Sequence, residues 1–334
     1  MKPKVEVISV GEKGAGKRLD HFLSRRFPTW SRSFWQAVIA RGGVEITRQG
    51  LAPGSPQASR RLLQGDSIYI DSSFIRQEDP HPFDEALRIL HCKERFIAVD
   101  KAAGLLSHPA GLFGGGSLID LLKERFSPLH LCGRLDRFTS GILLLARDKE
   151  ALSQFEQLSF RGLVGKYYLA LVEGVPKEPR GFIEAPIAKD ENSSIKLKMA
   201  ISPRGKKART EYELVSQKSS AKGLRSILKL RLETGRKHQI RLHLDHIDCP
   251  IVGDKLYGRE IDYEYFTPGR GNLHSYWPSW HGLHCYRLSF PSTLVELGGQ
   301  ELLLEPKREL AKEIESSGFT KSDLAPLFKG SAAH

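Results

Sequence analysis

A single acid lies between two arginines in the segment from Gly133 to Gly141. Arg134 and Arg137 flank Asp136, and the apolar run Ile142-Leu143-Leu144-Leu145-Ala146 follows directly. A nearby positive charge typically lowers a carboxylate pKa by about 1 to 3 units, so we expect Asp136 to be ionised. An ionised carboxylate can act as a nucleophile or as a base. The simpler alternative is an exposed salt-bridge loop without a catalytic role.

The elements around Asp136 are predicted from apolar patterning. The run at 142–146 ends at charged residues and predicts a strand that is covered on both faces. Its leading loop therefore opens at the edge of a sheet, where a rigid scaffold commonly holds catalytic groups. The same reasoning predicts strands at 96–99, 166–172, 208–215 and 224–233, and helices at 117–126 and 149–160.

A second polar cluster runs from Thr234 to Leu244 and begins a predicted amphipathic helix. This region holds three histidines, and two more follow downstream: His238, His243, His246, His281 and His284. Histidine is the commonest metal ligand, so a metal-dependent hydrolase is an alternative enzyme class. No H-E-x-x-H motif occurs, however, and spacings of five and three residues do not put three ligands on one helical face. We therefore expect no metal site.

Composition limits the class of partner. The chain has 334 residues, enough for two domains, and carries a net charge of +12 with a pI near 9.5. This charge favours an anionic partner, and nucleic acid fits best because no apolar run reaches about 18 residues. The four cysteines are far apart and form no C-x-x-C pair, which is typical of a reduced compartment without structural zinc. With no apolar core near Met1, we expect a cytoplasmic protein without a membrane partner.

The first 70 residues form a basic module. They contain four Lys and eight Arg against five acids, more than half of the net charge in about a fifth of the chain. Ser31 is a suitable cap for a helix that runs through Ala40, and apolar spacing predicts a shorter helix near 18–23. Short strands are expected at 44–46 and 65–70. We expect three basic side chains of this module to contact RNA phosphates: Arg18, Arg32 and Arg41.

Two resemblances follow from these motifs. The N-terminal R-L-D, S-R-S, G-V-x-I and G-D-x-I segments resemble an S4-type RNA-binding domain. Residues 17–310 resemble the RluA/RluD branch of the RNA pseudouridine synthases. That likeness rests on the G-R-L-D-R-x-T-S-G loop, the K-x-x-G turn at 101–104, the K-Y-Y strand, H-Q-I-R-x-H-L and V-G-D-x-L-Y-G. Gly133 departs from the family, which usually has His before R-L-D.

The resemblance implies that the chain isomerises uridine to pseudouridine in RNA without a cofactor. It implies that Asp136 is the catalytic aspartate and that Tyr168 packs on the base and acts as a base. It also implies that Arg241 pairs with Asp136 and keeps it anionic. For substrate binding, the resemblance implies that Leu256 lines the uracil pocket and that Arg134 fills the gap left by the flipped base. We also expect Lys101, in the K-x-x-G turn, to bind substrate.

The expected architecture is α+β: a pseudouridine synthase fold with a mixed, largely antiparallel sheet and flanking helices, plus a small N-terminal S4-like α/β domain. We expect the S4-like domain at 1–72, a linker at 73–86, the catalytic domain at 87–312 and a C-terminal tail at 313–334, weakly ordered after about Ser316. Family members with a leading S4-like module mostly act on large ribosomal RNA, so the resemblance implies that substrate. We also expect a monomeric enzyme. A tRNA pseudouridine synthase and a non-catalytic RNA-binding protein are the alternatives.

Overall fold

The computed structural model describes residues 5–27, 32–48, 54–71, 87–108, 117–195, 197–258 and 280–328. The chain divides into two compact units, one of residues 1–85 with 105–127 and the other of residues 86–104 with 128–334. The predicted linker at 73–86 lies outside the described residues.

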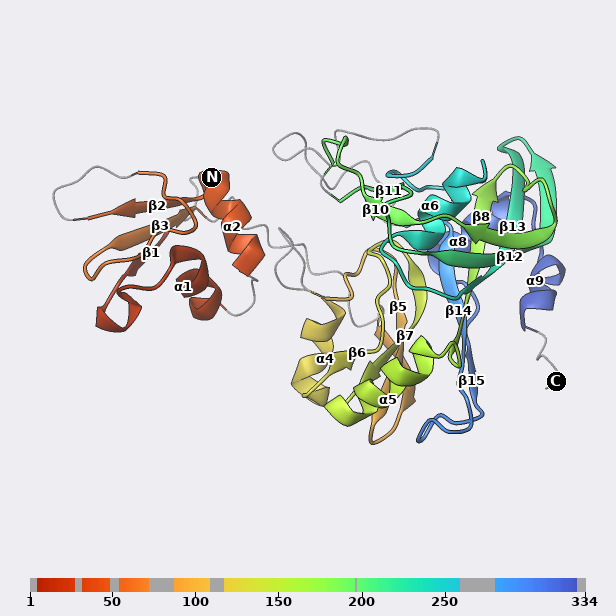
Figure 1. Cartoon of the computed structure of the whole chain (residues 1–334), viewed down its shortest axis with the longest axis horizontal. Helices are drawn as coiled ribbons and strands as arrows, with labels where there is room; N and C mark the ends of the chain where they lie inside the picture. The colour runs from red at the N-terminus through yellow and green to blue at the C-terminus, as the bar shows by residue number, and fades with distance from the viewer. Residues whose placement is uncertain are drawn as a thin grey trace. The chain divides into compact units, whose positions relative to one another are not determined.

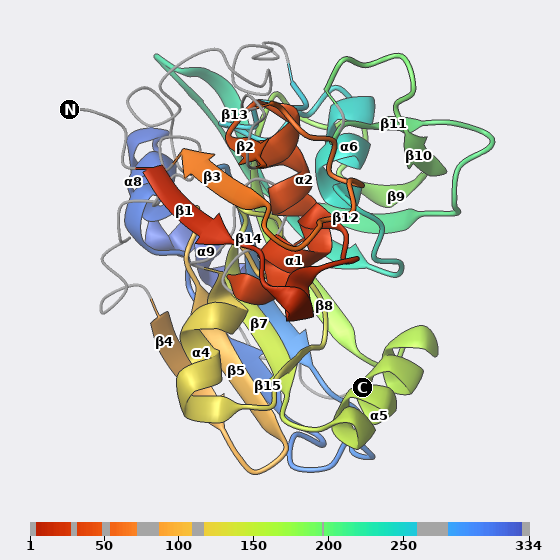
Figure 2. The same ribbon diagram turned by 90° about the vertical axis from the view of Figure 1, so that its left-hand side faces the viewer.

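The first unit contains a three-stranded antiparallel sheet with two helices against one face (Figures 1 and 2). The strand order is β1-β3-β2, with β1 at Val5–Ser9, β2 at Val44–Thr47 and β3 at Ser67–Asp71. Helices α1 (Leu19–Arg26) and α2 (Arg32–Ala40) confirm the predicted pair, whereas β1 was not predicted. Apolar residues of both layers form one buried core, which includes Leu19, Leu23, Trp35, Val38, Ile46, Ile68 and Ile70.

Helix α4 (Leu118–Phe126) also belongs to this unit and confirms the predicted helix. Its N-terminus has a capping box, in which Ser117 accepts from the backbone N–H of Asp120 and the Asp120 carboxylate accepts from that of Ser117. Such a pair satisfies two backbone donors that the helix itself cannot.

The second unit is built on one mixed sheet of ten strands within the described residues, in the order β4-β5-β7-β14-β8-β13-β12-β9, with β15 beside β14 and β6 beside β7. Only the β7–β14 pairing is parallel among these, so the predicted α+β class with a largely antiparallel sheet is confirmed. The strands are β4 (Leu87–Cys92), β5 (Phe96–Lys101), β6 (His130–Leu131), β7 (Ser140–Ala146), β8 (Gly165–Glu173), β9 (Arg180–Glu184), β12 (Arg209–Ser220), β13 (Gly223–Leu232), β14 (Leu283–Ser289) and β15 (Glu301–Leu303).

Strand β7 fixes the end of the loop that carries Asp136. Residues 141–146 are all buried, as the unbroken apolar run predicts. Gly141 has a φ of +116° and lies against the backbone of Cys285 in β14, where a Cβ atom would collide. Only glycine combines this dihedral with such a close approach. Gly141, the last residue of the G-R-L-D-R-x-T-S-G loop, therefore allows β7 and β14 to pair closely.

Helix α6 (Gln239–His246) begins at the second polar motif and stands near a small hairpin of β10 (Ile187–Lys189) and β11 (Met199–Ile201) in Figure 1. The buried Gln239 side chain fixes the start of this helix. Its oxygen accepts from Thr234 and from the backbone N–H of Arg236, and its amide donates to the carbonyl of Arg209. The glutamine of H-Q-I-R therefore ties α6 to β12.

Helices α5 (Lys149–Phe160), α8 (Arg308–Ser316) and α9 (Lys321–Phe328) complete this unit. The expectation of a weakly ordered tail after Ser316 is wrong as far as Phe328. Phe319 and Leu327 are each 2% exposed and pack with Leu310 and Tyr286 in one core cluster, so buried apolar area orders this segment. No helix among the described residues has the length and apolar character needed to cross a membrane.

Candidate active site

Arg241 connects two carboxylates at the centre of the site. Its Nη1 donates to Oδ2 of Asp136 at 3.0 Å, and its Nε and Nη2 donate to Oδ2 and Oδ1 of Asp254 at 2.6 and 2.8 Å. Asp254 also accepts from the backbone N–H groups of Leu256 and Tyr257. Asp254 is 1% exposed at its side chain and Asp136 is 29% exposed. The buried carboxylate of Asp254 therefore anchors the arginine, and that of Asp136 remains open to solvent.

The electrostatics keep Asp136 ionised. Burial alone would raise its pKa, but the positive charges of His238 and Arg241 and the hydrogen bond from Arg241 bring the pKa below its ordinary value. Arg241 is the dependable cause, because burial lowers the pKa of His238 to about 4 and leaves that ring neutral at pH 7. Burial likewise opposes ionisation of Asp254, yet Arg241 brings its pKa to about 2. An anionic and partly exposed carboxylate is thus present at neutral pH.

The K-x-x-G turn at 101–104 forms hydrogen bonds with the loop that carries Asp136. Lys101 is fully buried, and its Nζ donates to the carbonyls of Ala102 and Arg137 at 2.9 and 3.1 Å. Gly104 exchanges two hydrogen bonds with Arg137, giving its N–H to the Arg137 carbonyl and accepting from the Arg137 Nε. Burial lowers the pKa of Lys101 to about 7, with the charge of Asp136 acting against it. The turn thus fixes the residue next to Asp136.

The T-S-G residues of the loop bind two histidines in or beside β14. Thr139 Oγ1 lies 2.8 Å from His281 Nε2, and Ser140 Oγ lies 2.8 Å from His284 Nδ1. His284 Nε2 is 3.0 Å from the carbonyl of Leu304, which can only accept. His284 therefore carries its proton on Nε2, and the Ser140 hydroxyl donates to Nδ1.

Tyr168 lies in β8, close enough to Asp136 for that charge to affect its pKa. The residue is only 7% exposed. Burial raises its pKa well above the usual value, and Cys285 and the charge of Asp136 raise it further. Its hydroxyl shares a hydrogen bond with Cys285. At neutral pH the phenol therefore keeps its proton, which favours a packing role over that of a base.

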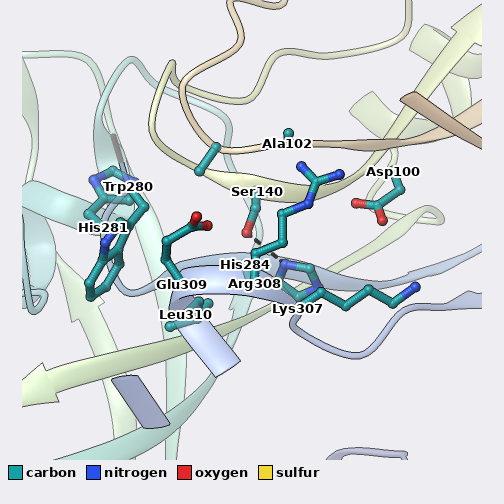
Figure 3. A pocket seen from close by; sticks show the side chains of 11 residues that line it. Asp100, Ala102, Ser140, Trp280, His281, His284, Lys307, Arg308, Glu309 and Leu310 are labelled. Atoms are coloured by element: carbon teal, nitrogen blue, oxygen red, sulfur yellow. Dashed lines mark hydrogen bonds between the residues drawn. The ribbon is translucent and has the colours of Figure 1, made fainter. Parts of the chain in front are cut away.

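A small cavity is lined by Ser140 and His284 but not by Asp136 (Figure 3). Its volume is about 20 Å³, little more than the roughly 10 to 15 Å³ that one water needs. Trp280 and His281 line one end, and Asp100 and Lys307 line the other, with the Ser140–His284 hydrogen bond between them. A nucleotide does not fit this cavity, so it is not the substrate site.

Comparison with known proteins identifies the family. Residues 95–246, which include Asp136, Tyr168 and Arg241, match the family model for RNA pseudouridylate synthase. An RNA pseudouridine synthase of Chloroflexus aurantiacus is 34% identical over 283 residues, covering 80% of this chain and 81% of its own. The ribosomal large subunit pseudouridine synthase D of Xanthomonas campestris is 35% identical over 256 residues, covering 75% of this chain and 73% of its own. The chain belongs to the RNA pseudouridine synthase family.

A solved structure agrees with this assignment. The human RNA pseudouridylate synthase domain containing 4 aligns with a TM-score of 0.51 at 26% identity, over 69% of this chain and 92% of its own. The second unit thus has the pseudouridine synthase fold, and the protein is an RNA pseudouridine synthase, an isomerase that modifies RNA.

The predicted site residues of this synthase fall into different surroundings. Asp136 and Arg241 are in contact, and Arg134 is exposed on the same loop. Leu256 is 1% exposed and packs in a cluster with Leu242 and Tyr257, so its side chain has no open surface for uracil in this arrangement. The expectation that Lys101 binds substrate is not supported, because its ammonium group is buried against two carbonyls.

In the first unit, the two predicted RNA-binding residues Arg18 and Arg32 converge on Asp20. Arg18 donates to both oxygens of Asp20, Arg32 donates to Oδ2, and the amide of Gln36 adds a fourth hydrogen bond. Burial opposes ionisation of Asp20, but these donors hold its pKa well below the usual range. The side chains of Arg18 and Arg32 stay 41% and 49% exposed. Arg41 is exposed just after α2.

Four of the five histidines that suggested a metal site form hydrogen bonds within the fold. His243 contacts the hydroxyl of Thr210 and the carbonyl of Ala185, and His281 and His284 contact the hydroxyls of the T-S-G motif. Within the described ranges, no three His, Cys, Asp or Glu side chains come together as metal ligands.

Sequence reasoning did not single out Asp254, and it named His281 and His284 only as possible metal ligands. Asp254 stands in the V-G-D-x-L-Y-G motif, from which only Leu256 was selected. Its signal was present, because an acid among the apolar residues Val252, Leu256 and Tyr257 needs a cation partner if it is buried. The two histidines had no such local signal, since their partners are more than 140 residues away in the sequence.

Proposed function

We propose that this synthase modifies specific uridines of large-subunit ribosomal RNA. Support comes from the Xanthomonas relative, which is named as a ribosomal large subunit pseudouridine synthase, and from a similarly named synthase D of Nitrosomonas europaea at 32% identity. The strongly basic chain suits an extended RNA surface. The observation that carries the catalytic assignment is Asp136, which is ionised, partly exposed and held by Arg241.

In the proposed mechanism, the target nucleotide is first extruded from its stack, at a cost of a few kcal/mol. Arg134, exposed on the loop, fills the vacated space and contacts phosphate. The uracil then meets the exposed oxygen of Asp136 and packs beside Tyr168. Asp136 acts as nucleophile toward the base or sugar, or as the base that removes the ribose 2′ proton, and its chemistry requires the anion that Arg241 maintains. In each route the C1′–N1 bond breaks and C1′ rejoins the uracil at C5. Any bond to Asp136 then breaks again, or the 2′ proton returns, while C5 loses its proton and N1 gains one. No cofactor takes part.

We further propose an S4-like RNA-binding domain at 1–72, a linker at 73–86, a catalytic domain at 87–312 and a C-terminal segment at 313–334. In the S4-like domain, Asp20 holds Arg18 and Arg32 side by side while leaving both half-exposed. Two oriented guanidinium groups and the nearby Arg41 are suited to backbone phosphates. We propose that the enzyme works as a cytoplasmic monomer.

The test is pseudouridine mapping of ribosomal and transfer RNA from cells that lack the gene, complemented with the wild type or with Asp136→Asn. We expect loss of one or a few large-subunit ribosomal sites and rescue by the wild type alone. Loss of a transfer RNA site would instead identify tRNA as the substrate. Rescue by Asp136→Asn would contradict the catalytic role of this carboxylate.

A further inference from the structure

His238 occupies an unusual backbone position next to the catalytic loop. It precedes α6 with a φ of 57° and a ψ of 19°, in the left-handed region that few non-glycine residues adopt. Strained residues of this kind persist where the surrounding structure over-determines them, and they cluster at functional sites. The side chain is 10% exposed, and its ring meets Tyr257 edge-on with a centroid distance of 5.6 Å. The strain places an imidazole between Tyr257 and Asp136.

The hydrogen bonds of Tyr257 settle which ring nitrogen carries the proton. The backbone N–H of Met199 donates to the Tyr257 hydroxyl oxygen at 2.9 Å, and His238 Nδ1 lies 2.8 Å from the same oxygen. Tyr257 is buried, and Nδ1 is the acceptor that the described residues offer to its hydroxyl proton. Nδ1 therefore accepts, and the neutral ring carries its proton on Nε2. Burial favours this neutral form and lowers the pKa of His238 to about 4, against the charge of Asp136.

That Nε2–H faces one particular oxygen of the carboxylate. His238 Nε2 lies 4.0 Å from Oδ2 of Asp136, the same oxygen that accepts from Arg241 Nη1 at 3.0 Å. Among the described residues, Oδ1 of Asp136 accepts no hydrogen bond, and the side chain is 29% exposed. The two oxygens of the proposed catalytic group are thus inequivalent, because Arg241 Nη1 and His238 Nε2 both lie on the side of Oδ2.

We propose that His238 is a positioning residue whose Nε2–H closes on Oδ2 of Asp136 when RNA binds, so that Oδ1 is the oxygen that meets the substrate. The inference rests on the proposed catalytic role of Asp136. The present 4.0 Å separation exceeds a hydrogen bond, and catalytic hydrogen bonds are often long without substrate and tighten in the complex. A bound nucleotide excludes water, which strengthens an N–H donor beside a carboxylate. With two donors on Oδ2, the carboxylate cannot rotate to exchange its oxygens.

Two substitutions separate this role from a role in the backbone. His238→Gln carries an amide N–H close to the position of Nε2, whereas His238→Asn reaches only the position of Nδ1. Asparagine tolerates the left-handed conformation better than glutamine does. A backbone role therefore predicts that the Asn variant is the more active, and a positioning role predicts the reverse order.

The measurement is kcat and KM on large-subunit ribosomal RNA purified from cells that lack the gene. We expect His238→Gln to retain kcat within about threefold, and His238→Asn to lose about 10- to 100-fold in kcat at similar KM, as for a misplaced reacting group. Thermal melts check that both variants fold. Tyr257→Phe is a second variant that keeps the ring but removes the proton that sets the tautomer, and we expect about a tenfold loss of kcat.

A spectroscopic measurement tests the tautomer in the wild-type protein independently of activity. With ¹⁵N-labelled histidine, the resonances that disappear in His238→Gln should be those of a neutral ring protonated on Nε2. A ring protonated on Nδ1, or full activity of His238→Asn beside an inactive Asp136→Asn, would overturn this inference alone. Full activity of Asp136→Asn would overturn the proposed function and this inference with it.

Discussion

Asp254 holds the guanidinium group of Arg241 through two hydrogen bonds, from Nε to Oδ2 at 2.6 Å and from Nη2 to Oδ1 at 2.8 Å. The third donor, Nη1, is left to contact Asp136. Arg241 also lies over the ring of Tyr257, with its Cζ 5.1 Å from the centroid. A planar group with a fork of donors is needed to bridge two carboxylates in this way.

The first prediction follows from this geometry. In Arg241→Lys, one ammonium group keeps the charge but cannot contact both Asp254 and Asp136 in fixed directions. We expect kcat to fall by about 100-fold or more because the reacting carboxylate is misplaced, with a smaller change in RNA affinity. Single-turnover assays and filter binding on the same RNA separate the two effects. A lysine variant with wild-type kcat would show that charge alone suffices.

The second prediction concerns the stability provided by the buried carboxylate of Asp254. Asp254→Asn removes the charge that compensates a buried arginine, and breaking a buried pair in this way typically costs about 3–5 kcal/mol. We expect the free energy of unfolding in urea to fall by this amount. The matched control is Glu213→Gln, since Glu213 is 55% exposed in its pair with Lys229, and exposed pairs contribute about 0–1 kcal/mol. Equal losses in the two variants would contradict the special role of Asp254.

The third prediction concerns Lys101, whose expected substrate contact the structure does not support. Lys101→Met keeps the length of the side chain but leaves the carbonyls of Ala102 and Arg137 without their donor. We expect kcat to fall by about 10- to 100-fold because the Asp136 loop loosens, with KM little changed. If KM rises while kcat stays constant, Lys101 contacts substrate after all.

Local pattern predicted those parts of the fold that depend on neighbours in sequence. Strand β7 and the helices α1, α2, α4 and α5 follow from apolar spacing and caps, whereas the mixed, largely antiparallel sheet was expected from the family resemblance. The ordered helix α9 was missed because its burial depends on a distant residue, Tyr286 of β14, whose ring packs against Phe328.

The candidate site divides in the same way. Asp136 stood out because the residues beside it are charged, but its contact with Arg241 spans 105 residues and came from family resemblance rather than spacing. The contacts of Thr139 with His281 and of Lys101 with Arg137 are likewise set by tertiary packing. A sequence pattern cannot tell an exposed, substrate-binding lysine from one that packs beneath a loop.

The fourth prediction concerns RNA binding near Asp136. Lys237 lies just before His238 at the surface. Partial desolvation of its ammonium group lowers its pKa, and the negative charge of Asp136 acts against this. The positive charges of Arg134, Arg241 and Lys189 lower the pKa further. A phosphate would relieve this crowding of positive charge. We expect Lys237→Gln to weaken RNA binding and to reduce the slope of log K against log salt by about 0.7 to 0.9. Binding titrations over a salt series measure both, and Lys312→Gln on α8 is the matched control. An unchanged slope would exclude a phosphate contact.

The last prediction concerns the pH dependence of stability. Burial lowers the pKa values of His238 and His284 to about 4 and of His281 to about 3. An unfolded histidine has a pKa near 6.5, so between about pH 4 and pH 6.5 the unfolded chain binds protons that the folded chain does not. Stability should therefore be lost as the pH falls from about 6.5 to 4, by up to about 1.4 kcal/mol per pH unit for each buried histidine.

Urea unfolding at a series of pH values tests this dependence. His284→Asn removes one of the three rings, so the slope of the free energy of unfolding against pH should fall by about one proton, whatever the variant does to absolute stability. The wild-type protein, measured in parallel, is the reference. If His284→Asn and the wild type have equal slopes, the ring of His284 is protonated in the folded protein, and the Ser140 hydroxyl then cannot donate to its Nδ1.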